Sequence, residues 1–262
     1  MRSASLQETV QTQYKTAGRL NTRISIHDKY STNQQGFGNW IFSHYRFYQG
    51  IRVLELGCGT GSMWLEKDEM IRYCNPLILS DLSNGMLATA TETLKKYDTI
   101  VFREIDIENI PYPPDSFDAV IANMMLYHVP DIDKGLSEVR RVLRKDGRFY
   151  CTTYGEKGIL PYLCSLFGFP VEESGINQTF TLQNGRETLL HHFGSVTRYD
   201  YPDSLAVTDV EDMVDYIYSL SGMAPLRVLS RDKVRSVLQN NMIDGVLSVP
   251  KEYGMFIAEQ KN

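Results

Sequence analysis

A glycine-rich run of nine residues, 53–61, limits what this chain can fold into more than any other feature. It reads Val-Leu-Glu-Leu-Gly-Cys-Gly-Thr-Gly, so an apolar segment typical of a β-strand leads into glycines at every second position. The acid in the run is Glu55, and the three glycines are Gly57, Gly59 and Gly61. Glycine adopts positive φ angles readily and lets a ligand approach the main chain closely. Helix-like sequence follows, which predicts the strand, loop and helix that form the nucleotide site of a doubly wound α/β sheet.

The spacing of the glycines indicates which ligand the loop accepts. A dinucleotide site needs a third glycine three positions after the second, and Ser62 occupies that position here. A phosphate-binding P-loop needs a lysine after its last glycine, and none follows Gly61. The acid at Glu55 disfavours a pyrophosphate and suits a ligand that carries ammonium and sulfonium charges. The expected cofactor is therefore S-adenosylmethionine.

The run resembles motif I of the class I S-adenosylmethionine-dependent methyltransferases, in which E-x-G-x-G-x-G is the defining signature. The similarity extends over about residues 50–154. It implies S-adenosylmethionine as the cofactor and methyl transfer as the activity. It also implies a Rossmann-like seven-stranded sheet that is mostly parallel and has an antiparallel last strand. A plain glycine-rich turn is the alternative interpretation of the same nine residues.

Strand and helix patterns alternate through the middle of the chain, which predicts βαβ units, a parallel sheet and helices on both faces. The expected strands are 51–56, 77–80, 100–104, 117–122 and 149–153. The expected helices between them include 83–94 and 136–143. Beyond residue 154 the patterns predict a strand at 194–200, helices at 210–220 and 228–240, and a terminal strand at 254–258.

This alternation divides the chain into three parts. Residues 1–50 are expected to form an N-terminal helical lid or cap segment, in which the apolar spacing predicts a helix at 40–48 that packs on the sheet. Residues 51–154 are expected to form the Rossmann-like core that binds S-adenosylmethionine. Residues 155–262 are expected to complete the same domain, with a substrate-side insertion after strand five and the last strands.

Composition and charge narrow the possible partners. The chain has 262 residues, 42% of them hydrophobic, which is enough for one large core. Its net charge of −5 disfavours nucleic acid, because duplex-binding proteins present a basic surface. No run approaches the roughly 18 apolar residues of a membrane span, and the N-terminus lacks the apolar core of a signal peptide.

The cysteines and histidines point to the compartment and to the absence of a metal. Four scattered cysteines fit a reducing compartment, so we expect a cytoplasmic protein. Neither the cysteines nor the pair His191-His192 has the spacing of metal ligands, so no metal is expected. The expected partner is a small-molecule methyl acceptor, and the sequence does not indicate an oligomeric state.

Ligands bind such sheets beyond the carboxyl ends of the strands, so the residues after each strand are candidates for the site. Asp81 follows the second strand, and its carboxylate can accept two hydrogen bonds from a ribose diol. A helix N-cap is the alternative role for Asp81. Leu82 and Met86 are expected to form apolar walls for the sugar and base, although Met86 also fits the core. Gly57 and Cys58 are expected to contact the methionine part of the cofactor through their backbone.

The resemblance implies roles for three further positions. Glu55 matches the motif I acid, which acts toward the amino-acid end of the cofactor, and holding the loop is the alternative. Asp106 stands where the family places an acid for the adenine amino group, with Ile107 beside the ring. Capping of its own loop is the alternative for Asp106. Asn123, at the end of the fourth strand, is included among the cofactor-binding residues.

The segment after the fourth strand, 123–129, indicates the class of acceptor. It lacks the Asn/Asp-Pro-Pro-Tyr/Phe motif of enzymes that methylate amino groups of DNA or protein. It is similar to the small-molecule branch that includes ubiquinone/menaquinone-biosynthesis-type methyltransferases. His128 is a candidate general base, and orientation of the loop is an equal alternative. Tyr127 is a second catalytic candidate, and Tyr14 and Tyr30 are candidates for the acceptor pocket.

Three other functions stay open at this point. A non-catalytic protein that binds S-adenosylmethionine would keep the cofactor motif and lack an acceptor pocket. A nicotinamide or flavin oxidoreductase shares the strand–loop–helix unit, but the glycine spacing disfavours it. A macromolecule methyltransferase needs a broad basic or peptide-binding face, which the charge balance does not favour.

Overall fold

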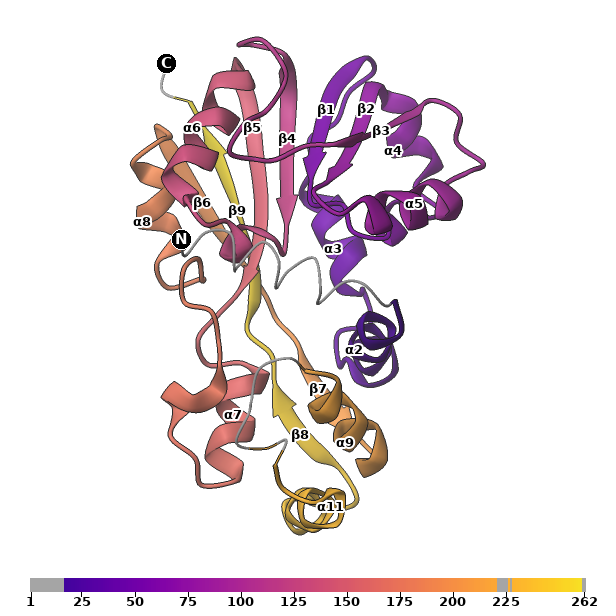
Figure 1. Cartoon of the computed structure of the whole chain (residues 1–262), viewed down its shortest axis with the longest axis vertical. Helices are drawn as coiled ribbons and strands as arrows, with labels where there is room; N and C mark the ends of the chain where they lie inside the picture. The colour runs from indigo at the N-terminus through magenta and orange to yellow at the C-terminus, as the bar shows by residue number, and fades with distance from the viewer. Residues whose placement is uncertain (1–16, 221–225, 227, 261–262) are drawn as a thin grey trace.

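The computed structural model describes residues 17–220, 226 and 228–260, and its central feature is a seven-stranded sheet (Figure 1). From one edge to the other the strands are β3 (Ile100–Glu104), β2 (Cys74–Asp81), β1 (Ile51–Leu56), β4 (Phe117–Asn123), β5 (Leu143–Tyr154), β9 (Tyr253–Glu259) and β6 (Ser195–Tyr201). The first five pair in parallel, whereas β9 is antiparallel to both β5 and β6. The predicted doubly wound sheet with an antiparallel last strand is therefore confirmed.

Helices cover both faces of the sheet. They are α3 (Phe37–His44), α4 (Asp68–Tyr73), α5 (Asn84–Thr93), α6 (Ile132–Val142) and α8 (Gly185–Leu190). The alternation along β5 separates the two layers, because Phe149 and Cys151 join the apolar cluster of α6 and α8, whereas Tyr150 joins the cluster of α3. Strands β1 and β4 are buried almost throughout. This explains their continuous apolar sequences, since a parallel sheet is covered on both sides.

A smaller group of elements packs below the sheet in Figure 1, and we call it the cap. It comprises α2 (Ala17–Tyr30), α7 (Ile159–Leu166), β7 (Ser204–Val207), α9 (Val210–Ser219), α11 (Arg231–Asn240) and β8 (Leu247–Pro250). Strands β7 and β8 form an antiparallel pair that the sequence patterns did not predict. Apolar side chains of the cap form a core of their own, which includes Ile26, Leu163, Val214, Leu238 and Val249. The N-terminal helix α2 and the helix α7 that follows β5 thus share one hydrophobic core.

The helix expected after the glycine loop is only a single 3₁₀ turn, η1 (Ser62–Trp64). It stops early because Glu66 has a positive φ of 59°, a conformation that interrupts a right-handed helix. The side chain of Trp64 is turned inward, with 1% of its surface exposed. Two further 3₁₀ turns are η2 (Leu126–His128) and η3 (Val171–Ser174).

The other predicted boundaries shift for local reasons. The helix predicted at 136–143 is α6, which begins at Ile132 because the side chain of Asp131 accepts a hydrogen bond from the Lys134 backbone N–H at 3.0 Å. The chain enters β5 directly after α6, so this strand begins before the predicted 149–153. The helix predicted at 40–48 ends at His44, since the next residue is extended. Within the described part of the chain, no helix combines the length and the apolar character needed to span a membrane.

Candidate functional site

The glycine loop leaves β1 in a conformation that other residues rarely adopt. Gly57, Gly59 and Gly61 have φ angles of 70°, 57° and 70°. A Cβ on Gly57 would lie 2.9 Å from Cγ of Met125, whereas a Cβ on Gly59 would meet no atom within 4 Å. The backbone N–H of Cys58 donates to the carbonyl of Ser80 at 2.8 Å and ties the loop to β2. The loop is therefore packed against the protein at Gly57 and open at Gly59.

Asp81 joins this loop to the start of α5. One of its carboxylate oxygens accepts a hydrogen bond from the Gly59 backbone N–H at 2.9 Å, and the other accepts from the Ser83 N–H at 2.8 Å. The helix N-cap is Ser83 rather than Asp81, because the Ser83 hydroxyl accepts from the Met86 N–H. Asp81 remains partly exposed, and burial raises its pKa. A partly exposed carboxylate beside the open glycine can accept further hydrogen bonds from a ligand.

The neighbouring candidates differ in exposure. Leu82 is partly exposed next to Asp81, whereas Met86 is buried in the interior with 4% of its surface exposed. Asp106 lies in the turn after β3, where its carboxylate accepts from the Glu108 backbone N–H at 2.9 Å. Ile107 is buried against α6, where its Cγ1 would be 3.3 Å from a Cβ on Gly135. The loop-capping contact of Asp106 is present, and the Ile107 side chain serves the core.

Glu55 and Asn123 belong to a buried polar network across β1, β4 and β5. The carboxylate of Glu55 accepts hydrogen bonds from the Trp64 indole N–H and, at 3.2 Å, from the Asn123 side-chain amide. The same amide donates to the Tyr45 hydroxyl at 2.8 Å, and its oxygen accepts from the Thr152 hydroxyl at 3.2 Å. These contacts favour the loop-holding interpretation of Glu55. The sequence could not reveal them, because only the sheet brings the partners together.

The pH dependence of stability should report on Glu55. Burial, with a smaller contribution from the charge of Asp81, raises the pKa of Glu55 to about 7. Because the folded pKa lies above the unfolded one, the stabilising contribution is complete below about pH 4.5 and is lost as the pH rises through 7. We expect Glu55 to lower the free energy of unfolding by about 2–4 kcal/mol over this interval. Urea unfolding of the wild type and of Glu55→Gln at pH 5 and pH 7.5 measures this free energy. If the free energy of unfolding changes equally between the two pH values in both proteins, the assignment to Glu55 is contradicted.

The acceptor-side candidates Tyr127 and His128 lie in η2, directly after β4. The ring centroid of Tyr127 is 4.5 Å from that of His128 and 4.6 Å from that of Tyr154, at the end of β5. The backbone carbonyl of Tyr127 accepts a hydrogen bond from the Asn177 side chain. Burial and the charge of Arg23 lower the pKa of His128 to about 4. His128 is therefore a neutral imidazole near pH 7, which can accept a proton but binds it weakly.

The remaining candidates lie elsewhere. Tyr14 falls outside the described residues. Tyr30 lies in the interior of the cap, where its hydroxyl donates to Asp212 of α9, so it joins α2 to α9 and has 5% of its surface exposed. His192 contacts Asp133 at 2.9 Å. In the part of the chain that the structure describes, no group of three or more His, Cys, Asp or Glu side chains is arranged to hold a metal ion.

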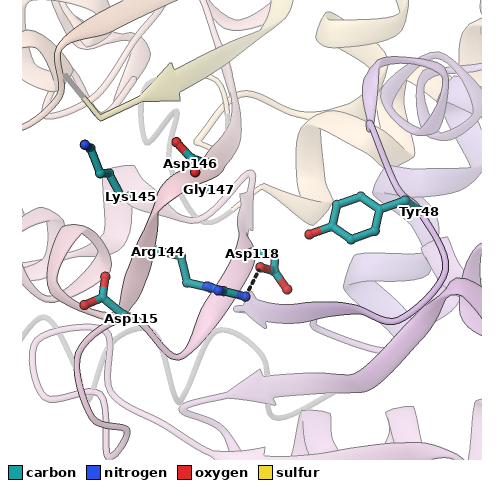
Figure 2. A pocket seen from close by; sticks show the side chains of 7 residues that line it. All are labelled: Tyr48, Asp115, Asp118, Arg144, Lys145, Asp146 and Gly147. Atoms are coloured by element: carbon teal, nitrogen blue, oxygen red, sulfur yellow. Dashed lines mark hydrogen bonds and ion pairs between the residues drawn. The ribbon is translucent and has the colours of Figure 1, made fainter. Parts of the chain in front are cut away.

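A hollow of about 420 Å³ lies at the other end of the strands, near the amino ends of the parallel strands β1, β4 and β5 (Figure 2). Its floor holds an ion pair in which Arg144 donates to the Asp118 carboxylate at 3.0 Å. The lining residues are Tyr48, Asp115, Asp118, Arg144, Lys145, Asp146 and Gly147. Because ligands of doubly wound sheets bind at the carboxyl ends of the strands, this hollow is separate from the glycine loop and the Asp81 carboxylate.

Known sequences support the resemblance inferred from the glycine run. Residues 54–151 match the profile of a family described as a methyltransferase domain. The ubiquinone/menaquinone biosynthesis C-methyltransferase UbiE of Pasteurella multocida is 30% identical over 124 residues, which are 46% of this chain and 46% of that protein. The chain thus spans about half the length of the curated relatives it matches. These similarities confirm the predicted likeness to S-adenosylmethionine-dependent methyltransferases.

Solved structures support the fold over nearly the whole chain. Phosphoethanolamine N-methyltransferase 2 of Haemonchus contortus, in complex with S-adenosyl-L-methionine, has a TM-score of 0.60 at 19% identity, covering 94% of this chain and 58% of that one. The [4+2]-cyclase SpnF has a TM-score of 0.60 at 17% identity and covers 97% of this chain and 96% of its own. At such identities these neighbours establish the fold alone, and they show that it accommodates more than one chemistry.

Proposed function

We propose that this chain binds S-adenosylmethionine at the carboxyl ends of its parallel strands and transfers the methyl group to a small-molecule acceptor. The observation that carries this proposal is the loop geometry, in which the open face of Gly59 lies beside the partly exposed carboxylate of Asp81. The main chain can then follow the methionine and sugar parts of the cofactor, while the carboxylate accepts the ribose hydroxyls. The family profile matched by residues 54–151 supports the same assignment.

The chain's own residues have little covalent chemistry to do in such a transfer. A sulfonium already carries a good leaving group, so most of the rate enhancement comes from positioning the acceptor in line with the methyl group. For well-aligned reactants this lowers the activation barrier by on the order of 7–11 kcal/mol. We propose that the cap, together with Tyr127 and Tyr154, closes the acceptor side. Aromatic faces there would also attract the cationic methylsulfonium. The low pKa of His128 favours orientation over strong general-base catalysis as its role.

A second candidate function uses the same cofactor without methyl transfer. The [4+2]-cyclase SpnF shares the fold over 97% of this chain, so the same fold supports a reaction other than methyl transfer, and this chain could bind S-adenosylmethionine without transferring its methyl group. An oxidoreductase is the weaker alternative, because Ser62 stands where a dinucleotide loop needs its third glycine.

Calorimetric titration followed by a turnover assay separates these functions. We expect S-adenosylmethionine and S-adenosylhomocysteine to bind with micromolar affinity, about −8 kcal/mol, and NADH not to bind. Incubation with S-adenosylmethionine and a fraction of small cellular metabolites should then release S-adenosylhomocysteine in step with a methylated product. Binding without release would favour the non-transferring function, and a preference for NADH would refute both.

A further inference from the structure

A buried ion pair joins the cap to the main sheet. Lys251 and Asp203 contact one another with side chains that are 2% and 0% exposed. Asp203 lies between β6 and β7, and Lys251 lies between β8 and β9, which are two of the links that pass between the sheet and the cap (Figure 1). A buried pair of charges seldom stabilises a fold more than apolar side chains of the same size would. Its position suggests a role other than stability.

The same pair holds the end of α2. The Ser31 hydroxyl donates to the Asp203 carboxylate, and the Asn33 backbone N–H donates to it at 3.0 Å. The ammonium of Lys251 lies 3.4 Å from the Ser31 hydroxyl oxygen. Three segments that are distant in sequence, the end of α2 and the two links, therefore meet at one point.

Two polar side chains are placed by this junction. The Lys251 ammonium lies 5.1 Å from the ring centroid of Tyr253, and the Tyr253 hydroxyl is 3.5 Å from Nε2 of His27 on α2. Tyr253 pairs across the sheet with Tyr154, whose ring contacts Tyr127. His27 and Tyr253 thus lie near η2, on the side of the sheet where we propose that the acceptor binds. Nδ1 of His27 is buried and has no hydrogen-bond partner among the described residues, so Nε2 is the atom available for bonding.

Both side chains are uncharged and partly exposed. Each keeps some accessible surface, yet burial is the main reason that the pKa of His27 falls to about 3 and that the pKa of Tyr253 rises. The charges facing His27 are Lys251, which lowers its pKa further, and Asp203, which raises it. The ring of Tyr216 on α9 also packs beside His27, with the two ring centroids 6.3 Å apart.

We propose that His27 and Tyr253 contact the reacting end of the methyl acceptor, that this end is an uncharged hydroxyl-bearing group, and that the Asp203–Lys251 pair positions both side chains. The inference rests on the function proposed above. A protonated phenol and a neutral imidazole can donate to and accept from a hydroxyl. Neither side chain provides a charge, and the charge that reaches the neighbouring His128 and Tyr216 is the positive one of Arg23, so a cationic group would lose its hydration without compensation.

Binding of simple probes to the protein saturated with S-adenosylhomocysteine tests the contact. Benzyl alcohol, benzylammonium and benzoate share a ring and differ in charge, and ligand-detected NMR compares them. We expect benzyl alcohol to bind best, and His27→Phe and Tyr253→Phe each to weaken it about tenfold, the effect of one lost hydrogen bond. Binding of a charged probe instead, binding of none, or unchanged affinity in both variants would overturn the inference. Wild-type protein that fails to bind S-adenosylhomocysteine would instead refute the proposed function.

A second measurement tests the positioning role. In the wild type, the His27 ring should stay neutral by NMR down to about pH 5, and titration near its ordinary pKa of about 6.5 would overturn the proposal. The double variant Asp203→Leu/Lys251→Met should fold, because apolar replacement of a buried pair is tolerated. Without the pair we expect His27 to leave its buried position, so that its pKa rises toward the ordinary value and benzyl alcohol binds about tenfold more weakly. Lys251→Arg should retain both properties. A double variant identical to the wild type in both would show that the pair is only structural.

Discussion

Replacing Gly57 by alanine should destabilise the protein more than the same change at Gly59, two residues further along the glycine loop. The left-handed conformation costs a residue with a Cβ about 1–2 kcal/mol, and the new methyl would press on the Met125 side chain, which adds about 1–3 kcal/mol of overpacking. The free energy of unfolding should therefore fall by about 2–5 kcal/mol. Urea denaturation of the ligand-free protein measures this.

Gly59→Ala is the matched control for that experiment. Gly59 has a similar positive φ of 57°, but a Cβ there would meet no atom within 4 Å. Its stability loss should be limited to the backbone strain, about 1–2 kcal/mol. If the open face is where the cofactor lies, this variant should still lose affinity for S-adenosylmethionine. Equal stability losses in the two variants, or full affinity in Gly59→Ala, would contradict the loop geometry as the basis of binding.

Asp81→Ala should weaken S-adenosylhomocysteine binding about tenfold to a hundredfold, which corresponds to about 1.5–3 kcal/mol for lost charge-assisted hydrogen bonds. The change removes the proposed ribose acceptor and the contacts that hold the Gly59 and Ser83 N–H groups. Isothermal titration calorimetry measures the affinity directly, and the melting temperature of the free protein reports any structural loss.

Ser83→Ala separates the two roles of that carboxylate. This variant loses the N-cap of α5, at a cost of about 1 kcal/mol in stability, but it leaves Asp81 in place. We expect its affinity for S-adenosylhomocysteine to stay close to that of the wild type. If Asp81→Ala binds as tightly as Ser83→Ala does, the carboxylate has no part in ribose recognition.

The order of elements along the chain was predictable because each depends on a local pattern. The strand at 51–56 is observed as β1 with the same bounds, and the strand at 100–104 is β3. Continuous apolar runs mark strands that are covered on both faces. The predicted bounds shift where a single side chain decides, as at Asp131, whose cap begins α6 earlier. The β7–β8 pair was not predicted, because short strands have no internal signal strong enough to distinguish them from loops.

Local sequence patterns determined the strands of the parallel core and the left-handed glycine loop, because a loop that leaves a strand carries its geometry within a few residues. The seven-stranded sheet with its antiparallel last strand followed from the resemblance to methyltransferases. Only the tertiary structure decided that Glu55 holds Trp64 and Asn123 together, and that Tyr30 lies inside the cap. It alone brought His27 within reach of Tyr253, 226 residues further along the chain. Contacts between such distant segments depend on how helices pack over the sheet, and no periodicity or motif in either segment encodes the partner.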